Sequence, residues 1–392
     1  MADDKEPLES ALDRYAKQLR RSLEEVTDVK ILQEKPLIAK DTSPYSSNSF
    51  SYSFFHDSSH AKISRQSFYP CFFFDQEFQQ ANQLKQRLLA EYKGQALEDV
   101  FSGRVIVTNE GSCFNIFSHK ECDFPQLSSS LSRDKILSDL KLLYGIGEIT
   151  EQQLKAQGYR TIDDLVNHPR FGSLARDFLS PFTEDDYDTI ISQLANCYWV
   201  SSSHPLLFYA AGFFSPEDFV IIDIETLGLF SRPIILFGVA TIHESIVELN
   251  QLLLRDITEE PAALVALSQI IDDKAVFISY NGRAFDIPYI NQRFAFYGIG
   301  SGFRNNHFDL LHFARRAWKN QLPNCQLTTI ESHLLGIQRV DDIPSALVPE
   351  FYDTYLEQQN VGPLIPIIEH NKQDLLSLAT IFAKLSEEWL YD

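Results

Sequence analysis

Two carboxylates stand two residues apart in an apolar run that has the composition of a buried strand. The run is FVIIDIETLG, residues 219–228, and the two acids are Asp223 and Glu225. Because side chains alternate between the two faces of a strand, these two side chains point to the same face. Like charges held this close repel each other unless a positive charge lies between them. The spacing therefore predicts a divalent cation site on this strand.

Two further acids lie where they could complete such a site. Asp286 lies in SYNGRAFDIPYI, just after a strand-like run that ends at Asn281-Gly282 and in the first turn of a predicted helix. Asp374 follows His370 by four residues in a strongly periodic helical segment, so the two side chains share one helix face. Four carboxylates and one imidazole form an oxygen-rich donor set of the kind that Mg²⁺ and Mn²⁺ prefer.

The segments that must position these residues alternate between strand-like and helix-like patterns. Three β-branched, apolar runs at residues 219–225, 234–242 and 245–254 are joined by short links, which predicts an antiparallel meander. A helical run, a strand at 275–281 and a second helix follow, which predicts a parallel step. We therefore expect residues 215–392 to form an α/β domain with a mixed five-stranded sheet flanked by helices.

The first 130 residues divide into two segments of different composition. Residues 1–66 hold one amphipathic charged stretch and a Ser-rich tract, so we expect a flexible N-terminal arm with one helix. Residues 67–130 carry short aromatic and β-branched runs, from FYPCFFFDQEF to RVIVTNEGSCFNIFSH. These runs predict a small β-containing module with a hairpin around NEGS.

Residues 131–200 predict a small helical module. Apolar residues at helical spacing lead into Gly145-Ile146-Gly147, and the helix that follows ends at Gly158. A Gly-apolar-Gly turn at the start of a helix presents free backbone N–H groups that could bind an anion. Glu148 and Glu151 oppose phosphate binding there. A packing unit or protein-contact module is therefore the alternative.

Composition and charge constrain the function of the whole chain. Its 392 residues are 44% hydrophobic, which allows two or three domains with packed cores. A net charge of −20 argues against a broad basic surface for nucleic acid, although bound cations would reverse the field locally. There is no signal-peptide pattern and no apolar run of about 18 residues. We therefore expect a cytoplasmic protein with no contact to a membrane.

The three groups of residues resemble the motifs of the DEDD superfamily of 3′-to-5′ exonucleases, which have a ribonuclease H-like fold. The matching residues are Asp223, Glu225 and Thr226 in the first motif, Asn281, Phe285 and Asp286 in the second, and His370 and Asp374 in the third. The histidine stands four residues before the last aspartate, which is the spacing of the tyrosine-containing subgroup. The subgroup therefore stays open.

A longer resemblance runs from about Phe68 to the C-terminus. The segment HFDLLHFARRAW, the stretch DDIP and the run HNKQDLLSL resemble the YprB-like group of predicted exonucleases. Upstream, GIGEITEQQL resembles a helix-hairpin-helix module, which holds nucleic-acid phosphates at its glycine turn. This resemblance implies a nucleic-acid substrate.

The resemblance implies a two-metal mechanism that releases nucleoside 5′-monophosphates from the 3′ end of a single-stranded nucleic acid. It implies two Mg²⁺ or Mn²⁺ ions held by Asp223, Glu225, Asp286 and Asp374, with His370 as the base and Thr226, Asn281, Phe285, Gly145 and Gly147 as substrate contacts. Two alternatives stay open. One is a catalytically silent scaffold that binds nucleic acid or protein, and the other is endonucleolytic cutting of the ribonuclease H type. The sequence does not distinguish DNA from RNA as the substrate.

Three residues in or near these motifs have two interpretations each. Asp309 is expected to cap a helix or to pair with a neighbouring arginine. Phe285 and Tyr289 could stack on a terminal base of the substrate, or they could pack in the core.

Overall fold

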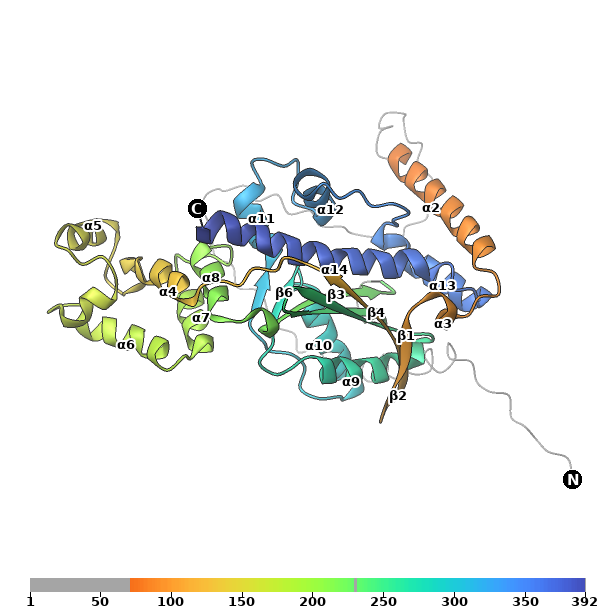
Figure 1. Ribbon diagram of the computed structural model, residues 1–392, viewed down its shortest axis with the longest axis horizontal. Coiled ribbons are helices and arrows are strands. Elements are labelled where there is room, and N and C mark those ends of the chain that lie inside the picture. Colours follow the sequence, from red (N-terminus) through yellow and green to blue (C-terminus); the bar gives the residue numbers. More distant parts are fainter. Residues whose placement is uncertain (1–70, 229–230, 392) are drawn as a thin grey trace, which may run out of the picture. The chain divides into compact units, whose positions relative to one another are not determined.

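The computed structural model describes residues 71–228 and 231–391 of the chain (Figure 1). The predicted arm at residues 1–66, with its predicted helix, lies outside the described residues. The chain divides into two units, Met1–Gln80 and Ala81–Asp392. All of the predicted site residues belong to the second unit.

A mixed sheet of seven strands forms the centre of the second unit, in the order β1-β2-β5-β4-β3-β6-β7. The strands are β1 (Gly103–Thr108), β2 (Gly111–Glu121), β3 (Phe219–Thr226), β4 (Ile234–His243), β5 (Ile246–Leu253), β6 (Val276–Ser279) and β7 (His307–Asp309). The predicted mixed α/β sheet is confirmed. Residues 215–392 contribute the five predicted strands, β3 to β7, and β1 and β2 extend the sheet to seven. The hairpin β1–β2, predicted in a separate module, joins this sheet because β2 pairs with β5, and the short β7 pairs with β6.

The strands that carry the site pair as the sequence predicts. β3, β4 and β5 form an antiparallel meander, and β6 pairs parallel to β3. β3 is therefore an interior strand with neighbours on both sides. Asp223 of β3 lies opposite Gly238 of β4.

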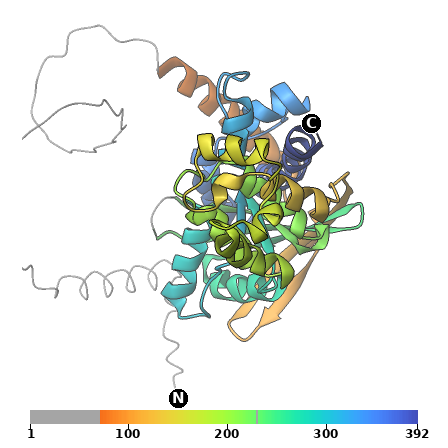
Figure 2. The ribbon, with the colours of Figure 1, turned by 90° about the vertical axis from the view of Figure 1, so that its left-hand side faces the viewer.

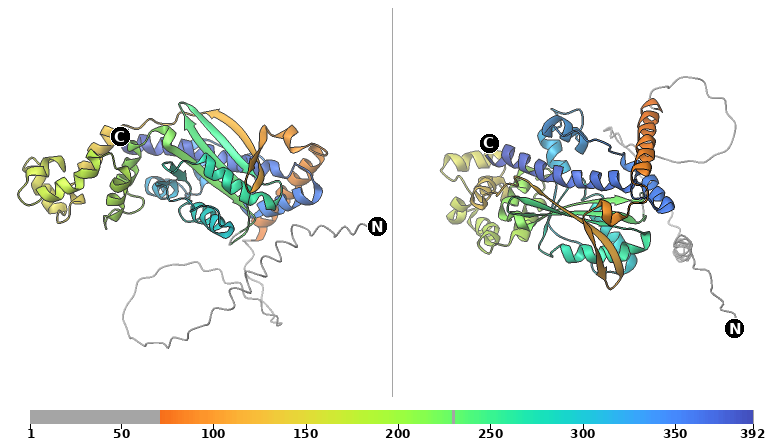
Figure 3. Two further views of the ribbon diagram at one scale, coloured as in Figure 1. Left: turned by 90° about the horizontal axis from the view of Figure 1, so that it is seen from below. Right: turned by 45° about the vertical axis from the view of Figure 1, so that its right-hand side comes forward.

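Helices cover both faces of this sheet (Figures 1 and 3). They are α9 (Glu260–Ile270), α10 (Asp286–Tyr297), α11 (Leu310–Trp318), α12 (Leu327–Ile330), α13 (Val348–Gln358) and α14 (Leu364–Ser386). Ile221 shares a core with residues of α11 and α14, whereas Ile222 and Ile224 share a core with residues of α9 and α10. Because β3 alternates its faces, Asp223 and Glu225 lie on the side of α14.

The segment before the hairpin is helical and not extended. Helix α2 (Cys71–Glu91) contains the aromatic run that we expected in an extended conformation, and the short α3 (Leu97–Val100) follows it. From residue 75 onward the segment is rich in Gln, Leu, Lys and Arg, which are strong helix formers. They outweigh the extended preference of the few aromatic residues at its start.

A separate core holds the helical module, whose helices are drawn in yellow and green in Figure 2. Its elements are α4 (Ser129–Leu137), η1 (Leu140–Leu142), α5 (Glu148–Ala156), η2 (Asp163–Asn167), α6 (Gly172–Thr183), α7 (Tyr187–Asn196) and α8 (Pro205–Tyr209). Helix α5 begins directly after Gly147, and Gly158 follows its end with φ of 100°. A short 3₁₀ turn, η1, precedes the glycines where a longer helix was expected. The helix-hairpin-helix resemblance therefore stays a prediction.

No helix in the described part of the chain combines the length and the apolar character that crossing a membrane requires.

Candidate functional site

A cavity of about 490 Å³ is lined by residues of β3, the β6–α10 connection and α14. Eight of the predicted site residues line it, namely Asp223, Glu225, Thr226, Asn281, Phe285, Asp286, His370 and Asp374. Gly145 and Gly147 line a different cavity, in the helical module. Every predicted metal ligand thus lines the same cavity, and the two glycines line another one. The functional roles of all ten residues stay predictions.

Asp223 is held by an amide from the facing helix. Asn371 of α14 donates from Nδ2 to Asp223 Oδ2 at 2.8 Å and to the Asp223 carbonyl oxygen at 3.2 Å. The Asn371 side chain is itself fixed, because Gln251 Nε2 of β5 donates to its Oδ1 at 2.8 Å. Both amides are fully buried. Three elements far apart in sequence therefore determine where the Asp223 carboxylate points.

The close approach of Asn371 requires a glycine in β4. A Cβ atom at Gly238 would lie 2.2 Å from Asn371 Oδ1 and 2.6 Å from its Nδ2. Atoms cannot pack at such distances, so any side chain at position 238 would displace the amide. Gly238 is thus part of the support of Asp223.

Asp286 is the first residue of α10 and is 6% exposed. Its Oδ1 accepts a hydrogen bond from the backbone N–H of Ile224 at 3.2 Å, which links the helix start to β3. The preceding turn is fixed by Asp309, which accepts hydrogen bonds from the N–H groups of Asn281 at 2.8 Å and Arg283 at 3.2 Å. Asp309 also caps α11 by accepting from the N–H of Leu311. Its predicted capping role is confirmed.

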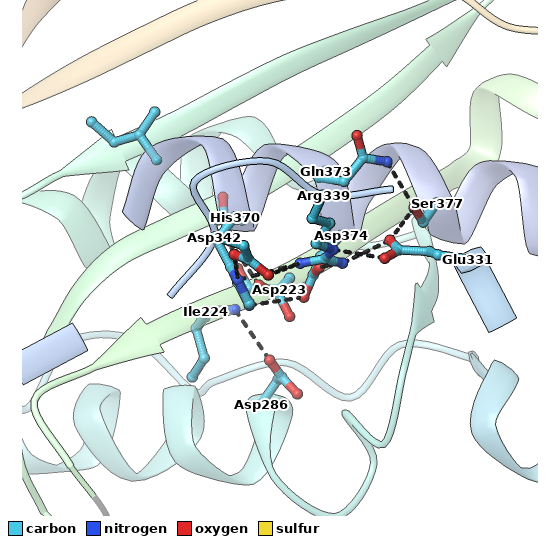
Figure 4. Close-up of polar contacts among 12 residues, drawn as sticks. Asp223, Ile224, Asp286, Glu331, Arg339, Asp342, His370, Gln373, Asp374 and Ser377 are labelled. Carbon is cyan, nitrogen blue, oxygen red and sulfur yellow. Dashed lines mark hydrogen bonds and ion pairs between the residues drawn. The ribbon is translucent and has the colours of Figure 1, made fainter. Parts of the chain in front are cut away.

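Asp374 and His370 are engaged by a charged network (Figure 4). His370 Nε2 lies 3.7 Å from Asp374 Oδ2, so the helical spacing does place the two side chains together. On the other side of the ring, His370 Nδ1 lies 2.6 Å from Asp342 Oδ1. Arg339 donates from Nη2 to Asp374 Oδ1 and is also held by Glu331.

Burial raises the pKa of all four predicted carboxylate ligands. The pKa of Asp286 rises to about 7 and that of Glu225 to about 8, in both cases first because burial penalises the charged form. The pKa values of Asp223 and Asp374 are also raised, chiefly by burial. Nearby carboxylates add to the rise at Asp223. Without a bound cation, Asp286 and Glu225 therefore hold their protons to higher pH than ordinary carboxylates do.

The pKa of His370 is raised to about 9, although burial alone would lower it. Its hydrogen bond with Asp342 and the charges of Asp374 and Glu225 outweigh the effect of burial. The same hydrogen bond helps to lower the pKa of Asp342. The ordinary value of about 6.5, on which the prediction of a base rests, therefore does not hold in the metal-free site, where the ring is protonated at neutral pH.

The chemistry of the donor set fits a divalent cation, but the side chains are not gathered around one point. In the described part of the chain, no group of three or more His, Cys, Asp or Glu side chains stands ready to hold a metal ion. The Asp223 and Asp286 carboxylates each turn one oxygen to a neutral protein donor. Within the same residues, no ion pair is formed by Asp223, Glu225 or Asp286. In that part of the chain, His370 is the one charged neighbour that lowers the pKa of Glu225. A bound cation would neutralise the remaining acids.

The sequence reasoning missed the residues that support the ligands. They are Gln251, Glu331, Arg339, Asp342 and Asn371. Asp342 lies in the DDIP stretch and Asn371 directly follows His370, so their neighbours in sequence offered a signal. Arg339 stands two residues before the same DDIP stretch, whereas no motif named above contains Gln251 or Glu331.

Comparisons with known proteins agree with this architecture. Residues 220–386 match the RNase_H superfamily. The chain is also similar to the uncharacterized protein YprB of Bacillus subtilis (strain 168), with 32% identity over 182 residues. This similarity covers 45% of the chain and 44% of YprB, so the match spans less than half the length of that relative. The comparisons confirm the resemblance to the YprB-like group and the ribonuclease H-like fold.

Proposed function

Because residues 220–386 form a ribonuclease H-like domain, which indicates nuclease-type activity, we propose that this protein is a metal-dependent 3′-to-5′ exonuclease. Its substrate would be a single-stranded nucleic acid with a 3′ end, and its products would be nucleoside 5′-monophosphates. One observation supports this function above the others. Asp223, Glu225 and Asp286 line one cavity and form no ion pair among the described residues, and buried like charges are costly without a cation.

In this proposal Asp223, Glu225, Asp286 and Asp374 would hold two Mg²⁺ or Mn²⁺ ions. When bound, two such ions stabilise the charge on the attacking and leaving oxygens of a displacement at phosphorus. Asn371 orients Asp223 through the hydrogen bond at 2.8 Å. Thr226, Asn281 and Phe285 line the same cavity and would contact the terminal nucleotide. Phe285 is half-buried, and its ring centroid lies 5.3 Å from that of Tyr289 in the adjoining core. In this proposal the rest of the ring would stack on the terminal base.

His370 is proposed as the base that takes a proton from the attacking water. Asp342 holds its Nδ1 at 2.6 Å, which fixes the ring with Nε2 toward Asp374. The pKa of about 9 means that the ring must lose its own proton before it can accept one. Cations that neutralise Asp374 and Glu225 would lower this pKa, because those two charges help to raise it.

The helical module is proposed to bind the substrate backbone through Gly145 and Gly147. Of the two acids after this turn, Glu151 is engaged within the module, since its Oε1 accepts from the N–H of Leu140 at 3.2 Å and pairs with Lys155 at 2.9 Å. The charge of Glu151 is thereby largely compensated. Glu148 is the other acid after this turn, and its charge opposes phosphate binding.

A catalytically silent ribonuclease H-like scaffold is the second candidate. The observation that favours it is that no group of ligands among the described residues stands ready to hold a metal ion. Such a scaffold would bind no divalent cation at the four carboxylates. Measuring Mn²⁺ binding to the whole chain by titration calorimetry separates the two candidates.

The activity itself can be tested on 5′-labelled single-stranded DNA and RNA, in Mg²⁺ and in Mn²⁺, with Asp223→Ala as the control. A ladder of shortening products that is absent from the control supports the exonuclease and identifies the sugar. Internal fragments of fixed length instead indicate an endonuclease. Intact substrates together with no Mn²⁺ binding contradict the proposed function.

A further inference from the structure

A buried pair of opposite charges lies behind the last predicted ligand. Glu331 is 1% exposed and opens the short π-helical segment η6 (Glu331–Leu335). Arg339 donates from Nε to its Oε2 at 2.6 Å and from Nη2 to its Oε1 at 2.7 Å. Ser377 of α14 donates to the same carboxylate. This is the bidentate geometry in which guanidinium and carboxylate groups bind most strongly.

The same guanidinium reaches the site. Arg339 Nη2 also donates to Asp374 Oδ1, and its Nη1 lies 3.7 Å from Asp342 Oδ2 (Figure 4). Because Glu331 already matches the charge of Arg339, the two residues together form a neutral unit. This unit offers N–H donors to Asp374 and adds no net positive charge next to the cation site.

On the basis of the proposed function, we propose that the Glu331–Arg339 pair is a positioning element for metal binding. Arg339 fixes Asp374 by holding Oδ1, and Oδ2, which faces His370 Nε2 at 3.7 Å, is left for the cation. Hydrogen bonds to a ligating carboxylate orient it, and loss of such a bond weakens metal affinity. Arg339 and Glu331 are therefore positioning residues and touch no substrate.

The opposite role is that Arg339 replaces the metal and competes with it. The two roles differ in sign. Removing a positioning residue weakens metal binding, whereas removing a competitor strengthens it. The bidentate contact with Glu331 favours the positioning role. The negative charge of Glu331 compensates the positive charge of Arg339, so the guanidinium repels a cation bound at Asp374 only weakly.

The test is Mn²⁺ titration calorimetry on the whole chain, comparing the unchanged protein with Arg339→Met and with the double variant Glu331→Leu/Arg339→Met. The single variant leaves Glu331 buried and unpaired, so it could unfold the domain. The double variant removes both charges and keeps an apolar contact, which preserves the fold. We expect it to bind Mn²⁺ with a Kd about 10–100-fold weaker, with unchanged circular dichroism.

A second buried pair supplies the matched control. Glu260 and Arg293 also form a fully buried ion pair, but neither lines the cavity. Glu260→Leu/Arg293→Met should leave the Mn²⁺ affinity unchanged. Equal or tighter Mn²⁺ binding by the Glu331/Arg339 double variant overturns the positioning role and leaves the proposed function standing. No Mn²⁺ binding by the unchanged protein overturns both.

Discussion

Two regions of this protein that bury a carboxylate surround it with different partners. Glu260 is fully buried and is satisfied on every side, since it accepts from Arg293 Nε at 2.7 Å, from Tyr297 Oη at 2.9 Å and from the N–H of Ile234 at 2.9 Å. Glu225 is also buried, yet it forms no ion pair within the described residues. The two acids are alike in type and in exposure. They differ in what surrounds them.

Burial of an acid therefore does not by itself indicate a functional site. At Glu260 the fold supplies a guanidinium that makes the charge part of the core. At Glu225 burial raises the pKa to about 8, and the charges of Asp374 and Asp286 add to the rise while that of His370 opposes it. A cluster that the protein leaves without enough cations is one that an external cation can complete.

The largest effect is expected for Asp223→Asn. This change removes one of the clustered charges and retains the shape of the side chain. We expect metal-dependent nuclease activity to fall by more than about 10²-fold, the scale on which a single transition-state contact acts. Thermal unfolding of the metal-free variant should show equal or higher stability, since one like charge is removed. A variant that keeps its activity contradicts the proposed site.

The opposite outcome is expected for Glu260→Gln. Here the change leaves Arg293 buried without its partner, which should lower the free energy of unfolding by about 3–5 kcal/mol. Activity per folded molecule should stay unchanged, because Glu260 does not line the cavity. Denaturant unfolding measures the first effect and a nuclease assay below the midpoint measures the second. A loss of activity without a loss of stability would reverse the roles of the two regions.

A smaller effect is expected for Gly238→Ala. The added Cβ would meet the Asn371 amide at 2.2 Å, so the hydrogen bond from Asn371 to Asp223 cannot form as it stands. We expect a Kd for Mn²⁺ about 10–100-fold weaker, as for other residues that orient a ligand. Asn371→Ala is the matched variant, because it removes the same hydrogen bond without overpacking. If Asn371→Ala binds Mn²⁺ normally, the amide has no part in the site.

A change of pH acts on the acids of the cavity without altering the chain. The folded-state pKa values of about 7 for Asp286 and about 8 for Glu225 lie above those of an unfolded chain. The metal-free protein therefore holds protons that its unfolded form releases, and its stability should fall as pH rises from about 5 toward 8. Since a cation must displace these protons, Mn²⁺ affinity should rise over that window by about tenfold per pH unit for each proton displaced. Scanning calorimetry at pH 6, 7 and 8 tests the trend in stability, and titration calorimetry at the same pH values tests the trend in Mn²⁺ affinity. Values that do not change with pH contradict the prediction.

Local periodicity placed two pairs of the residues that line the cavity. It gave no indication of Ser345, Ala346 and Pro349, which also line it. Asp223 and Glu225 share a face because a strand repeats every two residues, and His370 and Asp374 share a face because a helix brings positions four apart together. Both expectations depend on neighbours within one element. The hairpin around residues 109–112 was predictable for the same reason.

What connects distant segments could not be predicted in this way. The pairing of β2 with β5 joins residues more than a hundred positions apart, and no periodic pattern encodes it. Arg339 lies outside every helix and strand, so no repeat indicated that it reaches Asp374. The raised pKa of His370 depends on Asp342, 28 positions away, whereas the predicted value assumed an isolated ring.

The contact between Gly238 and Asn371 gives a criterion for comparing this chain with other sequences. A related chain with a larger residue at the position of Gly238 has no room for an asparagine at the position of Asn371. Such a chain can retain all four acids and still lack the group that orients the first of them. Reading these two positions together therefore separates sequences that inherit the whole supported site from sequences that inherit only its charges.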